Sequence, residues 1–194
     1  MLAGGDAFTY FYPYRAYAAQ ALSSGQIPLW NPYLFLGVPF VANPQTGVFY
    51  PPNVLLAWLV PALPFGGAAA SFGRVNAPQL VAWSLVLHTA LAACGAYLYA
   101  RRTLRLPPLP ALLAGGAFAY GGFLSGQAEH VNQLNVSAWF PWLLVLWEAR
   151  KKARWPTLLG LGAVIGLGLL AGHAQSSYIT LVGLGLYALL PMLL

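Results

Sequence analysis

Asp6 is the first side chain in this sequence that could do chemistry. It is one of three acidic residues among 194, and it directly precedes an aromatic run typical of the boundary between water and lipid. A carboxylate at an apolar boundary tends to have a raised pKa unless it is paired, and a raised pKa suits a general base. The structural alternative is that Asp6 caps a helix beginning near Ala7. The two roles are compatible.

The most polar stretch of the second half runs from Gly126 to Asn135 and contains Glu129, His130 and Asn132. A Glu-His pair followed by amides can bind a sugar hydroxyl, a phosphate or a metal ion. Metal ligation is the weaker option, because adjacent Glu and His side chains point in different directions on a helix and no spaced third ligand follows. We therefore assign no metal ligands, although a divalent metal remains possible. The alternative is a polar loop between two apolar segments.

A second polar turn, Gly172 to Ser177, holds His173 and Gln175. It places a small residue and polar side chains at the end of an apolar segment, as a binding turn would. A simple tight turn explains the same composition.

The composition is that of a membrane protein. The chain is 59% apolar and 6% charged, with a mean hydropathy of +0.66, whereas soluble domains contain about 25% charged residues. The net charge of +6 does not require a nucleic-acid partner, because basic loops beside membrane spans account for it. Cys94 is the single cysteine, which excludes an internal disulfide and a thiolate metal cluster.

The basic residues indicate an orientation in the membrane. Seven of the nine lie in two clusters, each at the end of an apolar run, as cytoplasmic loops do: Arg101, Arg102, Arg105, Arg150, Lys151, Lys152 and Arg154. The stretches that hold Asp6, His130 and His173 then share the opposite, outer side. Arg15 and Arg74 are outward exceptions, for which an anionic ligand or lipid headgroup and an ordinary surface role are both open.

The elements that must position these groups fall into two parts. Residues 1 to 78 are rich in Pro, Gly, Asn and aromatics, and we expect an interfacial helix over 7 to 22, then loops, with no free membrane span even over 54 to 70. Residues 79 to 194 hold apolar segments near the roughly 20 residues that cross a bilayer core: 79 to 100, 106 to 125, 134 to 149, 155 to 172 and 177 to 194. In the first of these, His88 is expected to be neutral and hydrogen-bonded. The predicted fold is an all-α polytopic membrane protein of about five transmembrane helices preceded by an extracytoplasmic, interfacial segment.

Several landmarks in the chain resemble the bacterial YfhO-type membrane proteins. In the first half these are Gly5 to Tyr10, Ser24 to Pro32, Gly37 to Phe40, Asn43 to Gln45 and Phe49 to Asn53. In the second half they are Gly122-Phe123, 129 to 135, Ala138 to Trp142 and Ala171 to Gln175. The resemblance covers nearly the whole chain, and its first half is specific because that order of Pro, Trp, Asn and Gly has no compositional cause.

The YfhO-type proteins are in turn similar to the GT-C glycosyltransferases, multi-span enzymes that take a sugar from a polyprenyl-phosphate donor at the outer membrane face. The resemblance implies that Asp6 is catalytic and deprotonates the acceptor hydroxyl, while Arg15 or the histidines stabilise the leaving phosphate. It implies a bacterial plasma-membrane location, the lipid-linked sugar as partner and donor, and no certain cofactor. The implied substrate-binding residues are Arg15, Glu129, His130, Asn132, His173 and Gln175.

Members of that family are several times longer and carry a transmembrane helix before the acidic residue. The chain is therefore expected to be a fragment, truncated at both ends, of an integral membrane glycosyltransferase acting on a cell-envelope acceptor. The alternatives are a polytopic transporter, which would place its polar groups at mid-bilayer on broken helices, and a non-catalytic envelope-assembly protein.

Overall fold

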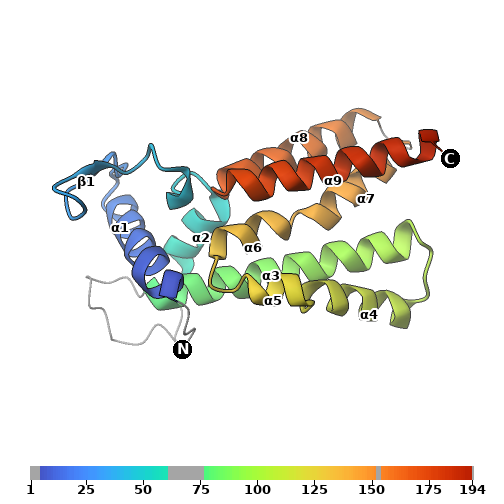
Figure 1. Cartoon of the computed structure of the whole chain (residues 1–194), viewed down its shortest axis with the longest axis horizontal. Helices are drawn as coiled ribbons and strands as arrows, with labels where there is room; N and C mark the ends of the chain where they lie inside the picture. The colour runs from blue at the N-terminus through green and yellow to red at the C-terminus, as the bar shows by residue number, and fades with distance from the viewer. Residues whose placement is uncertain (1–4, 61–76, 152–153, 194) are drawn as a thin grey trace.

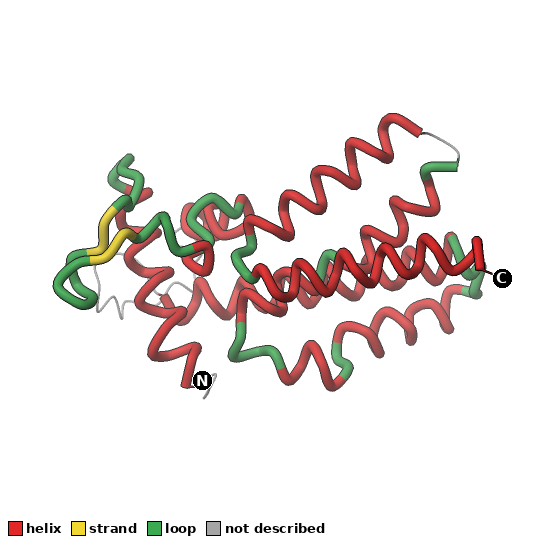
Figure 2. Tube along the Cα trace, turned by 45° about the horizontal axis from the view of Figure 1, so that its top comes forward, coloured by secondary structure: helices red, strands yellow, loops and turns green. Residues whose placement is uncertain are grey.

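The computed structural model describes residues 5–60, 77–151 and 154–193, which are almost entirely helical (Figures 1 and 2). The N-terminal part comprises the π-helical turn η1 (Ala7–Phe11), α1 (Tyr12–Ser23), the hairpin of β1 (Trp30–Asn31) and β2 (Val38–Pro39), the 3-10 turn η2 (Pro44–Thr46), and α2 (Pro51–Leu59). The remainder comprises α3 (Ala77–Arg102), α4 (Pro108–Ala119), α5 (Gly122–Gly126), α6 (Val131–Ser137), α7 (Phe140–Ala149), α8 (Arg154–Leu170) and α9 (Ala174–Leu193).

The long helices form a bundle with two chemically different ends. Helices α3, α4, α7, α8 and α9 run along the long axis of the molecule, while α1 and the hairpin lie across one end (Figure 1). We call this end the α1 end. The turn between α3 and α4 and the end of α7 lie at the other end, which we call the basic end because it carries Arg101 to Arg105 and Arg150-Lys151.

Two helical units are long and apolar enough to cross a membrane. They are Ala77–Arg102, which is α3, and Pro108–Gly126, which combines α4 and α5. Helices α8 and α9 are apolar over shorter lengths, Arg154–Leu170 and Ala174–Leu190. These four units correspond to predicted apolar segments.

The segment 134 to 149, predicted as a single span, is not one continuous helix but is divided between two helices. Helix α6 ends at Ser137 and α7 begins at Phe140. Pro141 explains the break, because it has no backbone N–H and its ring opposes the carbonyl group four residues earlier. Helix α6 also begins at Val131, inside the stretch expected to be a loop.

A similar break interrupts the predicted segment 106 to 125. Helix α4 ends at Ala119, and the extended backbone of Gly121, with φ −62° and ψ 159°, precedes α5. Farther upstream, the apolar stretch 54 to 70 begins within α2, but residues 61–76 lie outside the described part of the chain. Arg74 lies there too.

The main apolar core fastens the N-terminal turn to the bundle. It joins η1 to α3, α4, α5 and α6 through Phe11, Val81, Leu85, Ala92, Ala119, Leu124, Val131 and Leu134. A second core, of Leu143, Leu161 and Leu184, joins α7, α8 and α9. Because Phe11 of η1 and Val131 of α6 belong to the same core, the N-terminal turn is held beside the start of α6. This places Asp6 next to His130.

Candidate functional site

A cavity of about 280 Å³ lies at the α1 end, and we call it the Asp6 cavity. Four parts of the chain line it: the first turns of the N-terminal helix, the turn η2, the start of α6, and the turn before α9. The stretches that hold Asp6, His130 and His173 therefore meet in space. The lining residues are Asp6, Thr9, Tyr10, Phe11, Gln45, His130, Asn132, Gln133 and His173.

Asp6 and His130 face each other in this cavity. Asp6 Oδ2 lies 3.4 Å from His130 Nε2, a distance within ion-pair range but longer than a normal hydrogen bond. Asp6 already has a helical backbone, and its side chain makes no capping hydrogen bond with any described residue. The helix-cap alternative is therefore wrong, and the carboxylate, 60% exposed, is left facing the cavity.

The surroundings of His130 favour one state of its ring. Its Nδ1 atom is buried and has no hydrogen-bond partner among the described residues, while Nε2 points toward Asp6. A proton on Nδ1 would be a buried donor without an acceptor, which is costly. A hydrogen on Nε2 therefore fits the site better than one on Nδ1, and it points toward the carboxylate.

His173 lines the same cavity and also begins α9. Its Nδ1 accepts a hydrogen bond from the Ser176 backbone N–H at 3.1 Å, so the ring caps the helix. Burial, and then the nearby His130, lowers the pKa of His173. The turn before it is tight, since Gly172 has φ +88°, and a Cβ there would collide with the Pro44 carbonyl. The turn and cavity roles therefore coexist.

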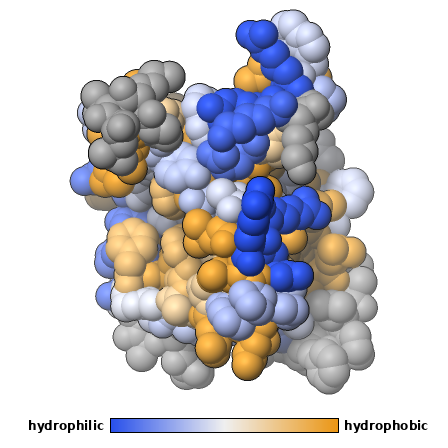
Figure 3. Space-filling view, turned by 90° about the vertical axis from the view of Figure 1, so that its right-hand side faces the viewer, coloured by the Kyte–Doolittle hydropathy of each residue, from blue (hydrophilic) through white to orange (hydrophobic). Residues whose placement is uncertain are grey.

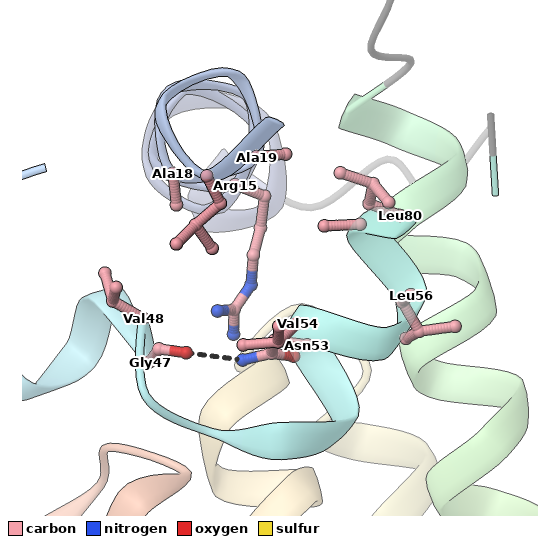
Figure 4. A pocket seen from close by; sticks show the side chains of 11 residues that line it. Arg15, Ala18, Ala19, Gly47, Val48, Asn53, Val54, Leu56 and Leu80 are labelled. Atoms are coloured by element: carbon pink, nitrogen blue, oxygen red, sulfur yellow. Dashed lines mark hydrogen bonds between the residues drawn. The ribbon is translucent and has the colours of Figure 1, made fainter. Parts of the chain in front are cut away.

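Arg15 is buried, contrary to both surface roles considered for it. It is 6% exposed, and burial lowers its pKa to about 10. Its Nη1 donates to the Thr46 carbonyl at 2.7 Å, and its Nη2 donates to Asn132 Oδ1 at 2.9 Å. Figure 4 shows the guanidinium pointing from α1 into the narrow space beside Gly47 and Asn53. A surface phosphate or headgroup cannot reach it there.

Arg15 instead positions two residues of the Asp6 cavity. Asn132, which accepts from Arg15, donates its Nδ2 to the Gln45 carbonyl at 2.7 Å, and both Asn132 and Gln45 line the cavity. Gly47 permits this arrangement, since it has φ +55° and a Cβ there would come within 2.9 Å of Arg15 Nη1. The cation thus connects α1, η2 and α6 beneath the site.

The structure brings together only part of the predicted set. Of the described candidates, Glu129 and Gln175 are exposed and lie outside the lining of the Asp6 cavity. Sequence reasoning assigned no role to Thr9, Tyr10, Gln45 or Gln133, which do line it. The signal for Gln133 was present in the amide-rich run, and that for Tyr10 and Gln45 in the landmark stretches. Thr9 lies in the same landmark stretch as Tyr10, one turn after Asp6.

His88 is hydrogen-bonded inside the bundle, as predicted. Its Nδ1 donates to the Ser84 carbonyl at 2.7 Å, so its Nε2 accepts from Tyr50 at 2.6 Å. The Tyr50 hydroxyl accepts in turn from Trp139 Nε1 at 2.8 Å. Asn135 Nδ2 donates to Ser84 Oγ at 3.2 Å, so a buried polar network joins α3, α6 and the start of α2.

Among the described residues, no three His, Cys, Asp or Glu side chains gather as metal ligands would. Comparison with protein-family models, curated proteins and solved structures finds no match for this chain. The arrangement of the Asp6 cavity therefore carries the functional argument.

Proposed function

We propose that the chain is part of an integral membrane glycosyltransferase that moves a sugar from a polyprenyl-phosphate donor to a cell-envelope acceptor at the outer face of the bacterial plasma membrane. The observation that carries this proposal is the Asp6 cavity itself. It combines an exposed carboxylate with two histidines, at the end of the bundle opposite the basic residues. The resemblance to YfhO-type proteins supports the same assignment.

A polytopic membrane location, with about five spans, accounts for the apolar surface of the bundle. Large apolar side chains lie exposed along its helices, which is unfavourable in water and suits lipid; they include Leu112, Leu113, Leu159, Ile179 and Leu186. Helix α8 has 17 residues and would be about 26 Å long at 1.5 Å per residue. A modest thinning of the bilayer accommodates that length. The broken pair α6 and α7 would cross together as one span.

The chemistry proposed for the cavity is a direct displacement. Asp6 takes the proton of the acceptor hydroxyl, and the acceptor oxygen forms a bond to the anomeric carbon. The bond between that carbon and the phosphate oxygen breaks, and polyprenyl phosphate leaves with the electron pair. His173, whose Nδ1 accepts from the Ser176 backbone N–H, can donate from Nε2 to the phosphate oxygens, a role that the buried Arg15 cannot take.

The size of the site is consistent with one sugar ring. Small-ligand sites have volumes of about 300 to 1,000 Å³, and the Asp6 cavity, at about 280 Å³, lies near the lower limit. Side-chain amide groups of Gln45, Asn132 and Gln133 line it, and amides can bind sugar hydroxyls.

Donor retention tests the proposal. Purified protein in lipid nanodiscs would be incubated with a radiolabelled polyprenyl-phosphate sugar, with unlabelled polyprenyl phosphate as competitor. His173→Asn keeps a side chain able to cap α9 but loses the imidazole. This variant should retain at least about ten-fold less donor, because it loses one charge-assisted hydrogen bond to the phosphate. Gln175→Ala, two residues away and outside the cavity, should retain the wild-type amount. Equal retention by both variants would refute the assignment.

A transporter is the second candidate, and one observation favours it. The polar network of Tyr50, Ser84, His88 and Asn135 lies inside the bundle, beside the break between α6 and α7, as in transporters with discontinuous helices. Proteoliposomes separate the two functions. Uptake of free sugar without consumption of a lipid-linked donor would favour transport.

A further inference from the structure

We propose that the basic end carries a binding site for the phosphate group of an anionic membrane lipid. A cavity of about 600 Å³ lies between the turn after α3 and the last turns of α7, and we call it the basic cavity. Its lining includes Arg102, Arg105, Lys151 and Glu148. This inference rests on the membrane location proposed above and not on sugar transfer.

The basic residues at this end divide into two groups. Arg101 Nη1 donates to the Leu106 carbonyl at 2.5 Å, and Arg150 donates to the Trp147 carbonyl and lies over the Trp147 ring, 3.5 Å from its centroid. Both guanidinium groups therefore already interact with other groups of this chain. Within the described residues, the side chains of Arg102 and Arg105 have no ion-pair or hydrogen-bond partner, and both are exposed. Figure 3, which looks onto this end, shows the hydrophilic side chains gathered there.

The charge balance of the basic cavity favours an anion. Its one carboxylate, Glu148, pairs with Lys151 at 3.1 Å and also accepts from the Tyr187 hydroxyl at 3.1 Å. Two guanidinium groups therefore remain unneutralised. Guanidinium binds phosphate oxygens through paired hydrogen bonds.

The backbone does not favour anion binding at the basic cavity. Helices α3 and α7 both end at the basic cavity, so their terminal carbonyl groups present partial negative charge. Binding must then depend on the Arg102 and Arg105 side chains, and removing both should weaken it strongly.

The shape of the basic cavity favours a lipid over free phosphate. From Lys151, just after α7, its lining continues along α7 through Ala149 and Glu148 to the apolar Val145, about one turn farther into the bundle. A polar mouth above an apolar wall matches a phosphodiester headgroup with its acyl chains directed toward the bilayer core. The volume also lies within the range of small-ligand sites.

Arg105 offers a variant that removes the charge without harming the fold. Its backbone has φ +56°, a left-handed conformation that glycine adopts without the steric cost imposed by a Cβ. Arg105→Gly should therefore keep or raise thermal stability in lipid-free detergent. If this variant binds less lipid, the loss of binding cannot then be explained by unfolding.

The experiment measures phosphatidylglycerol that remains bound to the purified full chain, by native mass spectrometry and by the shift in thermal midpoint on adding lipid. The variants are Arg105→Gly, Arg102→Gln and the double variant. The matched control is Arg154→Gln, which removes an exposed cation near this end but outside the lining of the basic cavity. Phosphatidylcholine and inorganic phosphate are added in separate arms.

We expect each pocket variant to bind phosphatidylglycerol about five-fold more weakly, and the double variant about 25-fold, while Arg154→Gln changes binding less than two-fold. Phosphatidylcholine and inorganic phosphate should give no shift. An equal loss in Arg154→Gln would show general surface attraction and overturn the site. A shift of equal size with inorganic phosphate would overturn its assignment to a lipid.

Discussion

Arg15 on α1 donates its Nη2 to Asn132 Oδ1 on α6 at 2.9 Å, across 117 residues of sequence. Its other terminal nitrogen donates to the Thr46 carbonyl at 2.7 Å. One buried cation therefore fixes the relative positions of α1, η2 and α6, which surround the Asp6 cavity. The residue acts on the site through Asn132 and not by contact with a substrate.

Replacing Arg15 with Met should destabilise the folded protein strongly. The change leaves Asn132 Oδ1 and the Thr46 carbonyl as buried acceptors without donors, at about 1 to 3 kcal/mol each. Arg15→Lys should restore only part of the stability, because one ammonium cannot reproduce the forked geometry. Thermal unfolding in detergent measures this, with the exposed Arg154→Met as control. A midpoint for Arg15→Met equal to that of the control would contradict the buried role.

Stability should fall in mild acid through His173. Because burial and His130 lower the pKa of His173 in the folded state, the unfolded chain binds this proton at the higher pH. The contribution is therefore fully present above the unfolded pKa of about 6.5 and is lost as the pH falls toward the folded value. Protonation also removes the acceptor that caps α9. Thermal midpoints of wild type and His173→Asn between pH 7.5 and 5 should converge as the pH falls, whereas parallel curves would contradict this origin.

Two glycine substitutions should change the stability of the folded protein in opposite directions. Gly172→Ala puts a Cβ at a left-handed position against the Pro44 carbonyl, so it should cost at least the 1 to 2 kcal/mol or so of that conformation. Gly162→Ala, in α8, meets nothing within 4 Å and should gain up to about 1 kcal/mol through helix propensity. Chemical or thermal unfolding compares the two. A neutral Gly172→Ala would show that the turn does not pack against η2 as described.

The two ends of the bundle should face opposite sides of the membrane. In a Cys94→Ala background, Glu129→Cys should react with an impermeant thiol reagent added to intact cells, and Leu104→Cys should react only after the membrane is opened. Both positions are exposed, so accessibility does not differ between them for structural reasons. Labelling of position 104 from outside would reverse the orientation.

Hydropathy and charge predicted the helical class and the separation of the basic residues from Asp6, His130 and His173. Both depend on local composition, which the sequence displays directly. The break at Pro141 was also visible, but the apolar residues on both sides concealed it. A single apolar run and two packed helices have the same hydropathy.

The contacts inside the site could not be predicted from local composition. Arg15 resembles a surface cation until its partners Thr46 and Asn132 are known, and those lie 31 and 117 residues away. Glu129 and His130 are neighbours in sequence, yet only His130 turns toward the Asp6 cavity. Such choices depend on long-range packing, which a polar run does not specify.

The most direct test of the account is sugar transfer from polyprenyl phosphate by Asp6→Asn, with Glu129→Gln as the matched control. Both changes replace a carboxylate with its amide at the α1 end, but only Asp6 lines the cavity. The full-length protein would be used, with expression and thermal midpoint matched between variants. We predict that Asp6→Asn lowers the transfer rate about 10²- to 10⁴-fold. Glu129→Gln should leave the rate unchanged. A wild-type rate in Asp6→Asn would contradict the catalytic assignment.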